Sequence, residues 1–259
     1  MANEAPKVGL GIDIGGSGIK GAPVDLSTGT FIVDRMKLAT PQPSTPRAVA
    51  AAVAEIAAAF PEHVDPGCPL GATFPAVIQH GVARSAANVD KSWIGVNVEE
   101  LLAEATGRAV HVLNDADAAA VAEHRYGAAA GVRGVVLLTT LGTGIGTALL
   151  VDGRLVPNTE FGHLEIDGHD AESRAASSAK EREDLSYERW ARERLQRYYS
   201  VVEDLLWPDL IVVGGGVSRK ADKFLPHLRL RTPIVPAQLR NTAGIVGAAA
   251  LAADLFDGA

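Results

Sequence analysis

The pattern of hydrophobic and polar positions along the chain predicts two copies of one β-meander. An apolar run rich in β-branched residues opens each copy, at 8–14 and at 134–140. Each run ends in a glycine turn, from which the chain returns as further strands. At an offset of 127 residues the two copies align Gly15 with Gly142. We interpret this internal repeat as a duplication.

Helical patterns alternate with strands outside the two meanders. Helices are predicted over 46–59, about 97–107, about 116–130, about 185–207 and 244–256. Ser186 is the expected N-cap of the long helix at 185–207. This alternation indicates an α/β fold in two similar lobes with a ligand cleft between them. We expect the smaller lobe to comprise 1–113 with 244–259 and the larger lobe to comprise 114–243.

The composition narrows the class of protein. The chain has 259 residues, of which 47% are hydrophobic and 21% charged, as in a globular protein. Cys68 is the single cysteine, which excludes an internal disulfide and a multi-cysteine metal site and fits a reducing compartment. No apolar run approaches the roughly 18 residues of a membrane span. We therefore expect a cytoplasmic protein that does not act on membranes.

The charge is unevenly distributed. The formal net charge is −7, which argues against general nucleic-acid binding. The stretch 211–240 differs, because it carries six Lys and Arg residues and only one acid, Asp222. It is either a solvated face or a local track for a polyanion.

Three glycine turns follow buried strands, at 15–18, 142–146 and 214–216. Glycine lets backbone N–H groups approach an anion without an intervening Cβ, and Ser17 and Thr143 add hydroxyl donors. None of the turns has the P-loop pattern or the dinucleotide-binding pattern. The turns therefore predict a phosphate site of another kind. Asp13, just before the first turn, could orient a metal-bound water or cap the turn, and both roles stay open.

Polar residues also cluster where strands end. Asn114 and Asp115 follow the strand at 110–113, and a carboxylate at such a position can accept a proton from a substrate hydroxyl. Asp117 is expected to cap the next helix. Glu160 and His163 follow a strand pair and would suit a polyol, whereas metal ligation by His163 is disfavoured because no second ligand lies at suitable spacing. Asn88 lies in a polar loop that is either a sugar contact or a surface turn.

Four stretches, DIGGSGIKGA, NDADAA, LGTGIG and VGGGVS, resemble the ROK family of sugar kinases over nearly the whole chain. That resemblance implies a duplicated actin/hexokinase-like (ribonuclease H-like) fold. Four more stretches are similar to the polyphosphate glucokinase branch, which includes polyphosphate/ATP glucomannokinases: TFPAVIQHG, SAANVDKSW, FGHLEIDGHDAE and LRTPIVPAQLRNTAGIVGAA.

The resemblance implies transfer of the terminal phosphoryl group of inorganic polyphosphate to the 6-hydroxyl of glucose, with Asp115 as catalytic base. The expected sugar ligands are Asn88, Asn114, Asp115, Glu160, His163 and Glu172. The expected donor-binding residues are Gly15, Gly16, Ser17, Lys20, Gly142, Thr143, Gly144, Gly215, Gly216, Arg231 and Arg240. Mg²⁺ is expected to be held mainly through the donor phosphates, and a homodimer is expected.

One family feature is absent. The family's last sugar ligand follows a cysteine-rich zinc motif, and here the chain passes from His163 to Glu172 without cysteines. No structural zinc is expected, and what fixes this loop stays open. ATP as a second donor and mannose as a second acceptor also stay open. The alternatives are an ATP-dependent hexose kinase of the same family, a non-catalytic sugar sensor and an actin-like filament protein.

Overall fold

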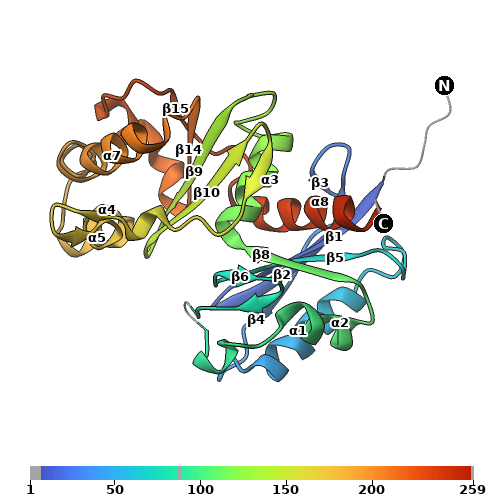
Figure 1. Ribbon diagram of the computed structural model, residues 1–259. Helices are drawn as coiled ribbons and strands as arrows, with labels where there is room; N and C mark the ends of the chain where they lie inside the picture. Colours follow the sequence, from blue (N-terminus) through green and yellow to red (C-terminus); the bar gives the residue numbers. More distant parts are fainter. Residues whose placement is uncertain (1–6, 87–88, 258–259) are drawn as a thin grey trace, which may run out of the picture. The chain divides into compact units, whose positions relative to one another are not determined.

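The chain forms two compact units, Met1–Ala122 with Asn241–Ala259 and Glu123–Arg240, in a computed structural model (Figure 1). The structure describes residues 7–86 and 89–257. Each unit is built on its own mixed β-sheet. The α/β prediction is confirmed.

The first unit contains a six-stranded sheet. Its strands are β1 (Val8–Ile14), β2 (Gly18–Asp25), β3 (Thr30–Phe31), β4 (Met36–Ala39), β5 (Leu70–Phe74) and β8 (Val110–Asn114). The order is β3-β2-β1-β5-β8, and β4 also pairs with β2. The β1–β2 pair is antiparallel, whereas β1–β5 and β5–β8 are parallel. The short strands β6 (Ile78–Gln79) and β7 (Val82–Ala83) form a separate hairpin.

The third strand of the first meander is interrupted, although the sequence predicts it as continuous over 30–40. Its two pieces, β3 and β4, pair with opposite ends of β2. Pro23 lies between these ends, and its carbonyl accepts from the N–H of Ile32. Proline has no N–H to return to the partner strand, so the ladder cannot continue past it.

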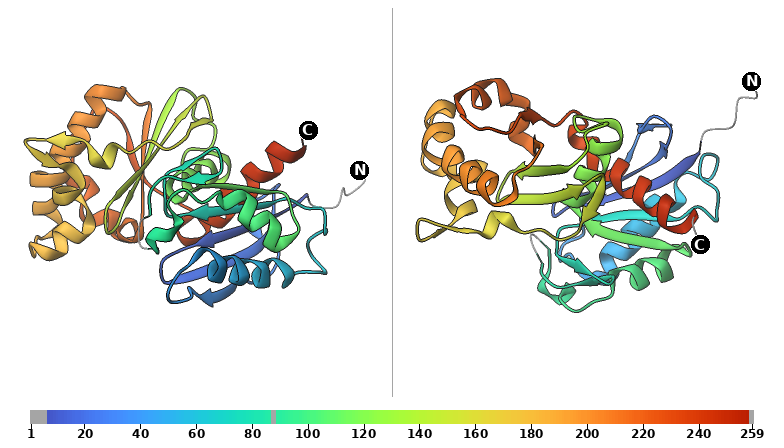
Figure 2. Two further views of the ribbon diagram at one scale, coloured as in Figure 1. Left: turned by 60° about the horizontal axis from the view of Figure 1, so that its bottom comes forward. Right: turned by 45° about the horizontal axis from the view of Figure 1, so that its top comes forward.

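Helices cover both faces of the first sheet (Figures 1 and 2). The helices α1 (Pro46–Ala58) and α2 (Val98–Thr106) pack on each other, and α8 (Ala243–Asp257) lies against β1 and β5 on the other face. The α2 ends match the prediction, because Asn97 Oδ1 accepts from Glu100 N and Gly107 ends the helix at φ 67°. A short 3₁₀ turn, η1 (Lys91–Trp93), precedes α2.

Small residues let α8 approach the sheet closely, as its composition predicts. A Cβ added at Gly11 would overlap the carbonyl of Ile245, and one added at Gly71 would overlap the carbonyl of Ala248. The backbone of α8 therefore lies directly on the two central strands of the sheet.

The second unit repeats the strand order of the first. Its strands are β9 (Val135–Leu141), β10 (Ile145–Val151), β11 (Arg154–Val156), β14 (Leu210–Gly214) and β15 (Ile234–Pro236), in the order β11-β10-β9-β14-β15. The β9–β10 pair is antiparallel, and β14 pairs in parallel with β9 and β15. At the offset of 127, β1 falls on β9 residue for residue. The structure confirms the predicted repeat.

Further helical segments join and flank these strands. The structure contains α3 (Asp115–Tyr126), α4 (Ala171–Ala175), α5 (Ser177–Arg182), α6 (Tyr187–Trp190), a π-helical turn (Ala191–Leu195) and α7 (Gln196–Leu206). Shorter elements are η2 (Phe161–His163), η4 (Gly216–Lys223), η5 (Leu225–His227), η6 (Arg240–Thr242) and the hairpin of β12 (Glu165–Ile166) and β13 (His169–Asp170). Over the described residues, no helix has the length and apolarity to cross a membrane.

The helix predicted over 185–207 runs from Tyr187 to Leu206 with a π-helical turn inside it. The hydroxyl of Ser186 accepts from Arg189 N, so the predicted N-cap is confirmed. Trp190 and Tyr199 on this helix are fully buried. The aromatic stripe of the helix is therefore part of the core of the second unit.

The boundaries between the units differ from the predicted ones. They lie at 122/123 and 240/241 rather than at 113/114 and 243/244. The first half of α3 packs with the first unit, where Leu113 and Ala118 form a cluster with Ala248 of α8. Asn114 and Asp115 consequently belong to the first unit.

Candidate active site

The first glycine turn joins β1 to β2. Gly15 N donates to Gly18 O (3.1 Å), and Thr40 Oγ1 donates to Gly15 O (2.5 Å). Gly16 is half-buried and Ser17 is exposed, so this turn is accessible from solvent.

Asp13 is held by side chains from neighbouring strands. Its Oδ1 accepts from Thr73 Oγ1 (2.8 Å), and its Oδ2 lies 3.5 Å from Lys20 Nζ. The side chains of Asp13 and Lys20 are each about a quarter exposed, at 25% and 28%. Asp13 is thus bonded across the sheet instead of to the turn amides, which argues against the capping role.

Asn114 and Asp115 lie where β8 passes into α3. Asn114 Oδ1 accepts from Ala116 N (2.8 Å), and Asn114 Nδ2 donates to Ala76 O (3.2 Å). Asn114 therefore caps α3, and the expectation that Asp117 does so is wrong, since Asp117 lies buried in the first turn. These two bonds use one N–H and one acceptor position of the Asn114 amide, which has two of each.

Asp115 has the electrostatics of a general base. Its Oδ1 accepts from Ala116 N (2.9 Å), and the residue remains accessible to solvent. The surrounding protein partly desolvates the carboxylate, which raises the pKa of Asp115, and the negative charge of Asp13 raises it further. A raised pKa strengthens the carboxylate as a proton acceptor once it is ionised.

In the second unit, one carboxylate links two of the predicted sugar ligands. Asp170 Oδ2 lies 2.9 Å from His163 Nδ1, and Asp170 Oδ1 accepts from Glu172 N (3.1 Å) at the start of α4. Glu172 Oε2 in turn accepts from Ile145 N (2.9 Å), just after the second glycine turn. His163 and Glu172 are therefore fixed relative to each other and to that turn.

The environment of His163 favours its protonated form. The hydrogen bond to Asp170 is the main cause of its raised pKa, and the charges of Glu172, Asp170 and Glu160 add to it. The Nδ1–H of the ring points to Asp170, so Nε2 is left to face a ligand. Glu160 is exposed, and its segment is held by Thr147, whose Oγ1 donates to Thr159 O (2.5 Å) and accepts from Phe161 N (3.0 Å).

The structure shows what fixes the cysteine-free loop. Asp167 and Gly168, at φ 54° and 74°, form the turn of the β12–β13 hairpin. Arg197 of α7 donates Nε and Nη2 to the two carboxylate oxygens of Asp167, at 2.9 and 2.8 Å. This two-pronged ion pair ties the hairpin to the helix. The sequence offers an Asp-Gly turn signal at this hairpin, but no local signal for its partner on α7.

His163, Asp170 and Glu172 also form a group whose ligand atoms lie within 4.8 Å of one another, which could hold a metal ion. Asp170 and Glu172 also accept hydrogen bonds that fix the loop and α4. Asn88, another predicted sugar ligand, lies outside the described residues.

The second glycine turn is tied to α5. Gly142 N donates to Gly144 O (3.0 Å), and Ser178 donates from its N to Gly142 O (3.0 Å) and from Oγ to Thr143 O (2.6 Å). The Thr143 residue is exposed. The carbonyls of this turn are thus occupied, and its hydroxyl is free to face a ligand.

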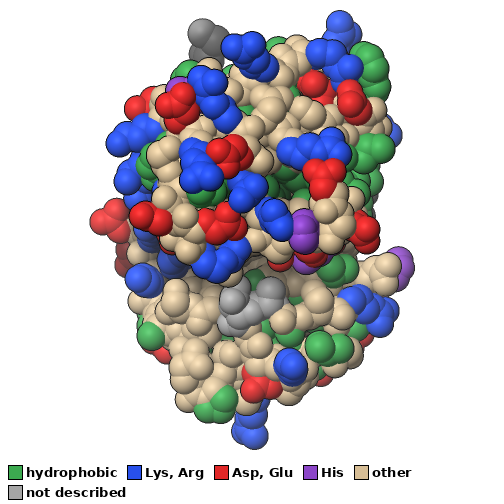
Figure 3. All heavy atoms as spheres, turned by 90° about the vertical axis from the view of Figure 1, so that its left-hand side faces the viewer, with side chains coloured by type: hydrophobic (Ala, Val, Ile, Leu, Met, Phe, Trp, Pro, Cys, Tyr) green, Lys and Arg blue, Asp and Glu red, His purple; other side chains and the backbone are tan. Residues whose placement is uncertain are grey.

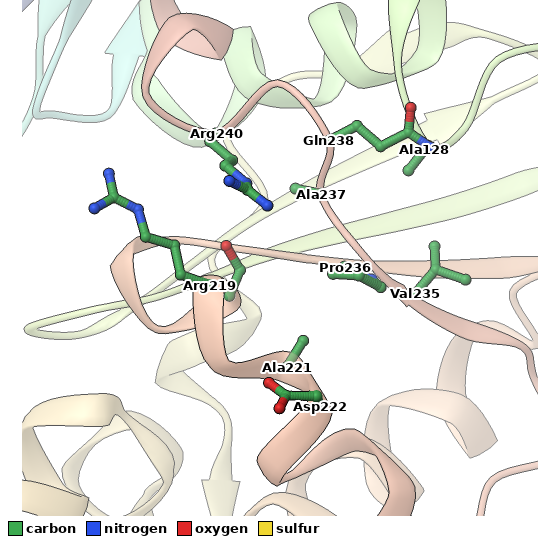
Figure 4. A pocket seen from close by; sticks show the side chains of 10 residues that line it. Ala128, Arg219, Ala221, Asp222, Val235, Pro236, Ala237, Gln238 and Arg240 are labelled. Atoms are coloured by element: carbon green, nitrogen blue, oxygen red, sulfur yellow. The ribbon is translucent and has the colours of Figure 1, made fainter.

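A pocket of about 500 Å³ lies within the second unit, and its lining includes Ser218, which follows the third glycine turn in the chain, but not Gly215 or Gly216. Gly215, at φ 79°, follows β14 directly. The pocket is lined by Ala128, Ser218, Arg219, Ala221, Asp222, Val235, Pro236, Ala237, Gln238 and Arg240. Figure 4 shows the two arginines at one end of this pocket and Val235 at the other. Charged and apolar surfaces are therefore combined in one cavity.

The structure does not bring every predicted donor residue to this pocket. Arg231 lies 2.7 Å from Asp204 and 3.6 Å from Glu203, and its guanidinium stacks on Trp207 at 4.0 Å from the ring centroid. Arg240 does line the pocket, together with Arg219, which the sequence analysis did not select. The spacing of these arginines along the chain gives no hint of that convergence.

Two like sheets, each with an antiparallel hairpin followed by parallel strands, define the actin/hexokinase-like class of fold. The turns and carboxylates described above belong to this scaffold. The chain belongs to the ROK family, whose model matches residues 9–176.

The comparisons with individual proteins agree with this assignment. The chain is 57% identical to the polyphosphate glucokinase of Mycobacterium tuberculosis (strain H37Rv), over 93% of this chain and 89% of that protein. It is similar to the crystal structure of an inorganic polyphosphate/ATP-glucomannokinase from Arthrobacter sp. strain KM, with a TM-score of 0.89 and 58% identity over 96% and 99% of the two chains. A ROK family glucokinase from Streptomyces griseus, in complex with glucose and AMPPNP, matches with a TM-score of 0.79 and 25% identity over 96% and 100%.

Proposed function

We propose that this protein is a polyphosphate glucokinase. It transfers the terminal phosphoryl group of inorganic polyphosphate to the 6-hydroxyl of glucose. A new bond forms between the hydroxyl oxygen and the terminal phosphorus, and the bond from that phosphorus to the chain oxygen breaks. The products are glucose 6-phosphate and a chain one phosphate shorter. The observation that carries the proposal is the 57% identity to the M. tuberculosis polyphosphate glucokinase over 93% of this chain.

Asp115 is the proposed catalytic base. It accepts the proton of the 6-hydroxyl as the oxygen attacks phosphorus. Its accessible position at the start of α3 and its raised pKa support this role. The carboxylate is ionised above its pKa, and the proton that it takes leaves to solvent after product release.

The proposed sugar ligands are polar groups that suit a polyol. His163 Nε2 and the carboxylates of Glu160 and Glu172 supply a donor and acceptors for the ring hydroxyls. Asn114 and Asn88 complete the proposed set. The bonds of Asp170 to His163 and to Glu172 N support a preformed geometry, which reduces the entropy lost when the sugar binds.

The donor phosphates are assigned to the glycine turns. The first turn offers Gly15, Gly16 and Ser17 beside Lys20, and the second offers Gly142, Thr143 and Gly144. Mg²⁺ is the proposed metal, and Asp13 fits it, because a single ordered carboxylate beside a phosphate site matches the preference of Mg²⁺ for oxygen ligands and water. When bound, the ion supplies positive charge against the charge that develops on the transferred group.

ATP is a second candidate donor, and the 500 Å³ pocket favours it. The pocket places apolar side chains of Val235 and Pro236 opposite Arg219 and Arg240, a combination that suits a base joined to phosphates. Gly215 and Gly216 precede this pocket in the chain. Mannose as a second acceptor stays open, as do the predicted homodimer and the predicted cytoplasmic location.

A coupled assay of glucose 6-phosphate formation tests the proposal. It would be run with Mg²⁺ and either nucleotide-free polyphosphate or ATP. We expect activity with polyphosphate, and activity with both donors if the pocket accepts a nucleotide. Activity with ATP alone would contradict the polyphosphate assignment and favour the ATP-dependent hexose kinase. Inactivity with both donors and all hexoses would favour a sugar sensor.

A further inference from the structure

Three lysines of the second unit converge on one aromatic ring. Lys180 Nζ lies 4.4 Å from the centroid of the Tyr187 ring, and Lys220 Nζ and Lys223 Nζ each lie 5.9 Å from it. We call these three side chains around Tyr187 the lysine cluster. Lys180 comes from α5, whereas Lys220 and Lys223 come from η4, so the fold brings together cations from distant parts of the chain.

The ring at the centre of the cluster is fixed. Tyr187 stacks on Phe224, with centroids 6.4 Å apart and planes at 21°, and meets Trp190 edge-on at 6.5 Å. Phe224 and Trp190 are fully buried. The aromatic platform is therefore part of the core, and it holds the lysine stems in a defined region of the surface.

Among the described residues, the lysines of the cluster have no acidic partners at ion-pair distance. Within residues 7–86 and 89–257, no carboxylate forms an ion pair with any of the three. Neighbouring arginines differ, since each of these forms an ion pair: Arg182, Arg189, Arg192, Arg194 and Arg197. Figure 3, seen from the side of α4, α5 and α7, shows how frequent Lys and Arg side chains are on this face.

Along η4, the lysines of the cluster follow directly on residues that line the pocket. Ser218 and Arg219, on η4, line that pocket, and Lys220 follows at once. The helix is interrupted at Lys220, at φ −119° and ψ 27°. Asp222, the acid between the two lysines of η4, lines the pocket with Arg219. One short segment thus contributes Arg219 to the pocket and Lys220 and Lys223 to the cluster.

An unpartnered set of like charges is stabilised by a multivalent anion. A nucleotide has a short phosphate chain that ends at its nucleoside, whereas polyphosphate carries a charge on every unit along an extended chain. Each ammonium–phosphate contact releases counterions, so several contacts in a row add up to substantial affinity. A polyphosphate chain that occupies the pocket region is long enough to contact the lysine cluster as well, whereas a nucleotide is not.

We infer that the lysine cluster binds the phosphates of a polyphosphate chain that lie remote from the transferred one. This inference rests on the proposed function, and it assigns the donor site a second part that ATP does not reach. The cluster would retain a long chain while its end is used, and so would set a preference for long donors.

The test is a triple variant, Lys180→Gln with Lys220→Gln and Lys223→Gln. We expect its KM for long polyphosphate to rise at least about tenfold and the slope of log KM against log salt concentration to fall by about 2, because up to three phosphate contacts are lost. KM for ATP, KM for tripolyphosphate, KM for glucose and kcat should stay close to wild type. The Lys→Arg triple variant keeps the charges and should keep the wild-type KM for long polyphosphate.

A matched control separates this site from general electrostatics. Arg154→Gln, Arg189→Gln and Arg192→Gln together remove the same total charge from exposed positions of the same unit. The control should leave KM for long polyphosphate near wild type. An equal rise in the control, or an unchanged KM in the lysine variant, would overturn the inference. If the triple variant fails to fold, the exposed single variants Lys220→Gln and Lys223→Gln carry the same test.

Calorimetric binding of long polyphosphate without glucose separates this inference from the proposed function. If the wild type does not bind polyphosphate, the proposed donor fails and the inference fails with it. If the wild type and the triple variant bind equally, only the inference fails.

A single-stranded oligonucleotide serves as a further probe. If its binding is weakened as much as that of polyphosphate, the cluster is a general polyanion surface and the inference is overturned.

Discussion

The two glycine turns that open the duplicated sheets lie at matching places in the chain but differ in their closing hydrogen bond and in their polar groups. At the offset of 127 residues, Asp13 of the first turn corresponds to Thr140, and Lys20 corresponds to Thr147. The hydroxyl of Thr147 forms hydrogen bonds with the segment that carries Glu160 and His163. The first copy thus keeps charged groups beside its turn, while the second copy uses hydroxyls to fix a loop.

This difference shows that the two copies of one scaffold carry different sets of polar side chains. The first unit combines Asp13, Lys20 and Asp115, which are groups for charge and proton transfer. The second unit connects His163, Glu172 and its own turn through hydrogen bonds, which is an arrangement for orientation. Strand order is common to both units, whereas the register of the opening hairpin differs by one residue, because Ile14 pairs with Ile19 and Leu141 pairs with Ile145. The division therefore lies in side chains, turns and loops.

The largest effect on activity is expected at Asp115, which has no counterpart role in the second unit. Asp115→Asn removes the proposed base but keeps the size of the side chain. We expect kcat to fall by about 10²–10⁴-fold, with glucose binding retained, because general-base assistance is lost. Steady-state kinetics and calorimetric glucose binding measure the two effects. A kcat within a few-fold of wild type would exclude Asp115 as the base.

Asp13→Asn replaces the carboxylate before the first turn with an uncharged group, as Thr140 is before the second turn. We expect kcat to fall by about 10²-fold, because a charge that supports phosphoryl transfer is lost. The raised pKa of Asp115 should also fall, since Asp13 is one of its causes, so the acid limb of the pH–rate profile should move to lower pH. Thr140→Val, at the matching position of the second turn, is the control. An unchanged acid limb in Asp13→Asn would contradict the coupling.

The two sheets can also be compared where helix α8 lies. Gly11 corresponds to Leu138, which is fully buried in the second unit. Gly11→Ala should destabilise the protein by about 1–3 kcal/mol, because the new methyl group would overlap the carbonyl of Ile245. Leu138→Ala should cost about 2–5 kcal/mol by leaving a cavity. Denaturant unfolding measures both, and tolerance of Gly11→Ala would show that α8 can move away from the sheet.

Asp170→Asn tests whether Asp170 holds His163 and the start of α4 in place for the sugar. We expect KM for glucose to rise about tenfold while kcat changes less, because His163 and the start of α4 lose a shared anchor. The pKa of His163 should fall, since the hydrogen bond to Asp170 is the main cause of its rise. Kinetics and NMR titration of the ring measure these changes. Glu165→Gln, on the same hairpin, is the control, and equal effects there would argue against a specific anchor.

Local signals in the sequence predicted much of the fold. The strand at 8–14, the capping of α2 by Asn97 and the capping of α6 by Ser186 all depend on neighbouring residues, and all are confirmed. The prediction of a continuous third strand over 30–40 was wrong, because Pro23 of the neighbouring strand has no N–H to pair with it. The unit boundary was misjudged because packing of α3 against α8 is a long-range contact.

The polar connections of the site were harder to predict. Asp115 could be selected from its place after a buried strand. The ion pair of Asp167 with Arg197 and the convergence of Lys180 with Lys220 on Tyr187 join residues 30 or more positions apart in the chain. Such pairs depend on how helices pack, and neither periodicity nor local spacing carries that information.

Helix α8 lies on the central strands of the first unit but follows the second unit in sequence. During synthesis on a ribosome, residues 123–240 must emerge before the sheet made by β1 and β5 can receive its covering helix. The second unit is contiguous and needs no later segment for its own sheet. We therefore expect the first unit to be completed after the second, with its glycine-lined face open to chaperones until α8 has been translated.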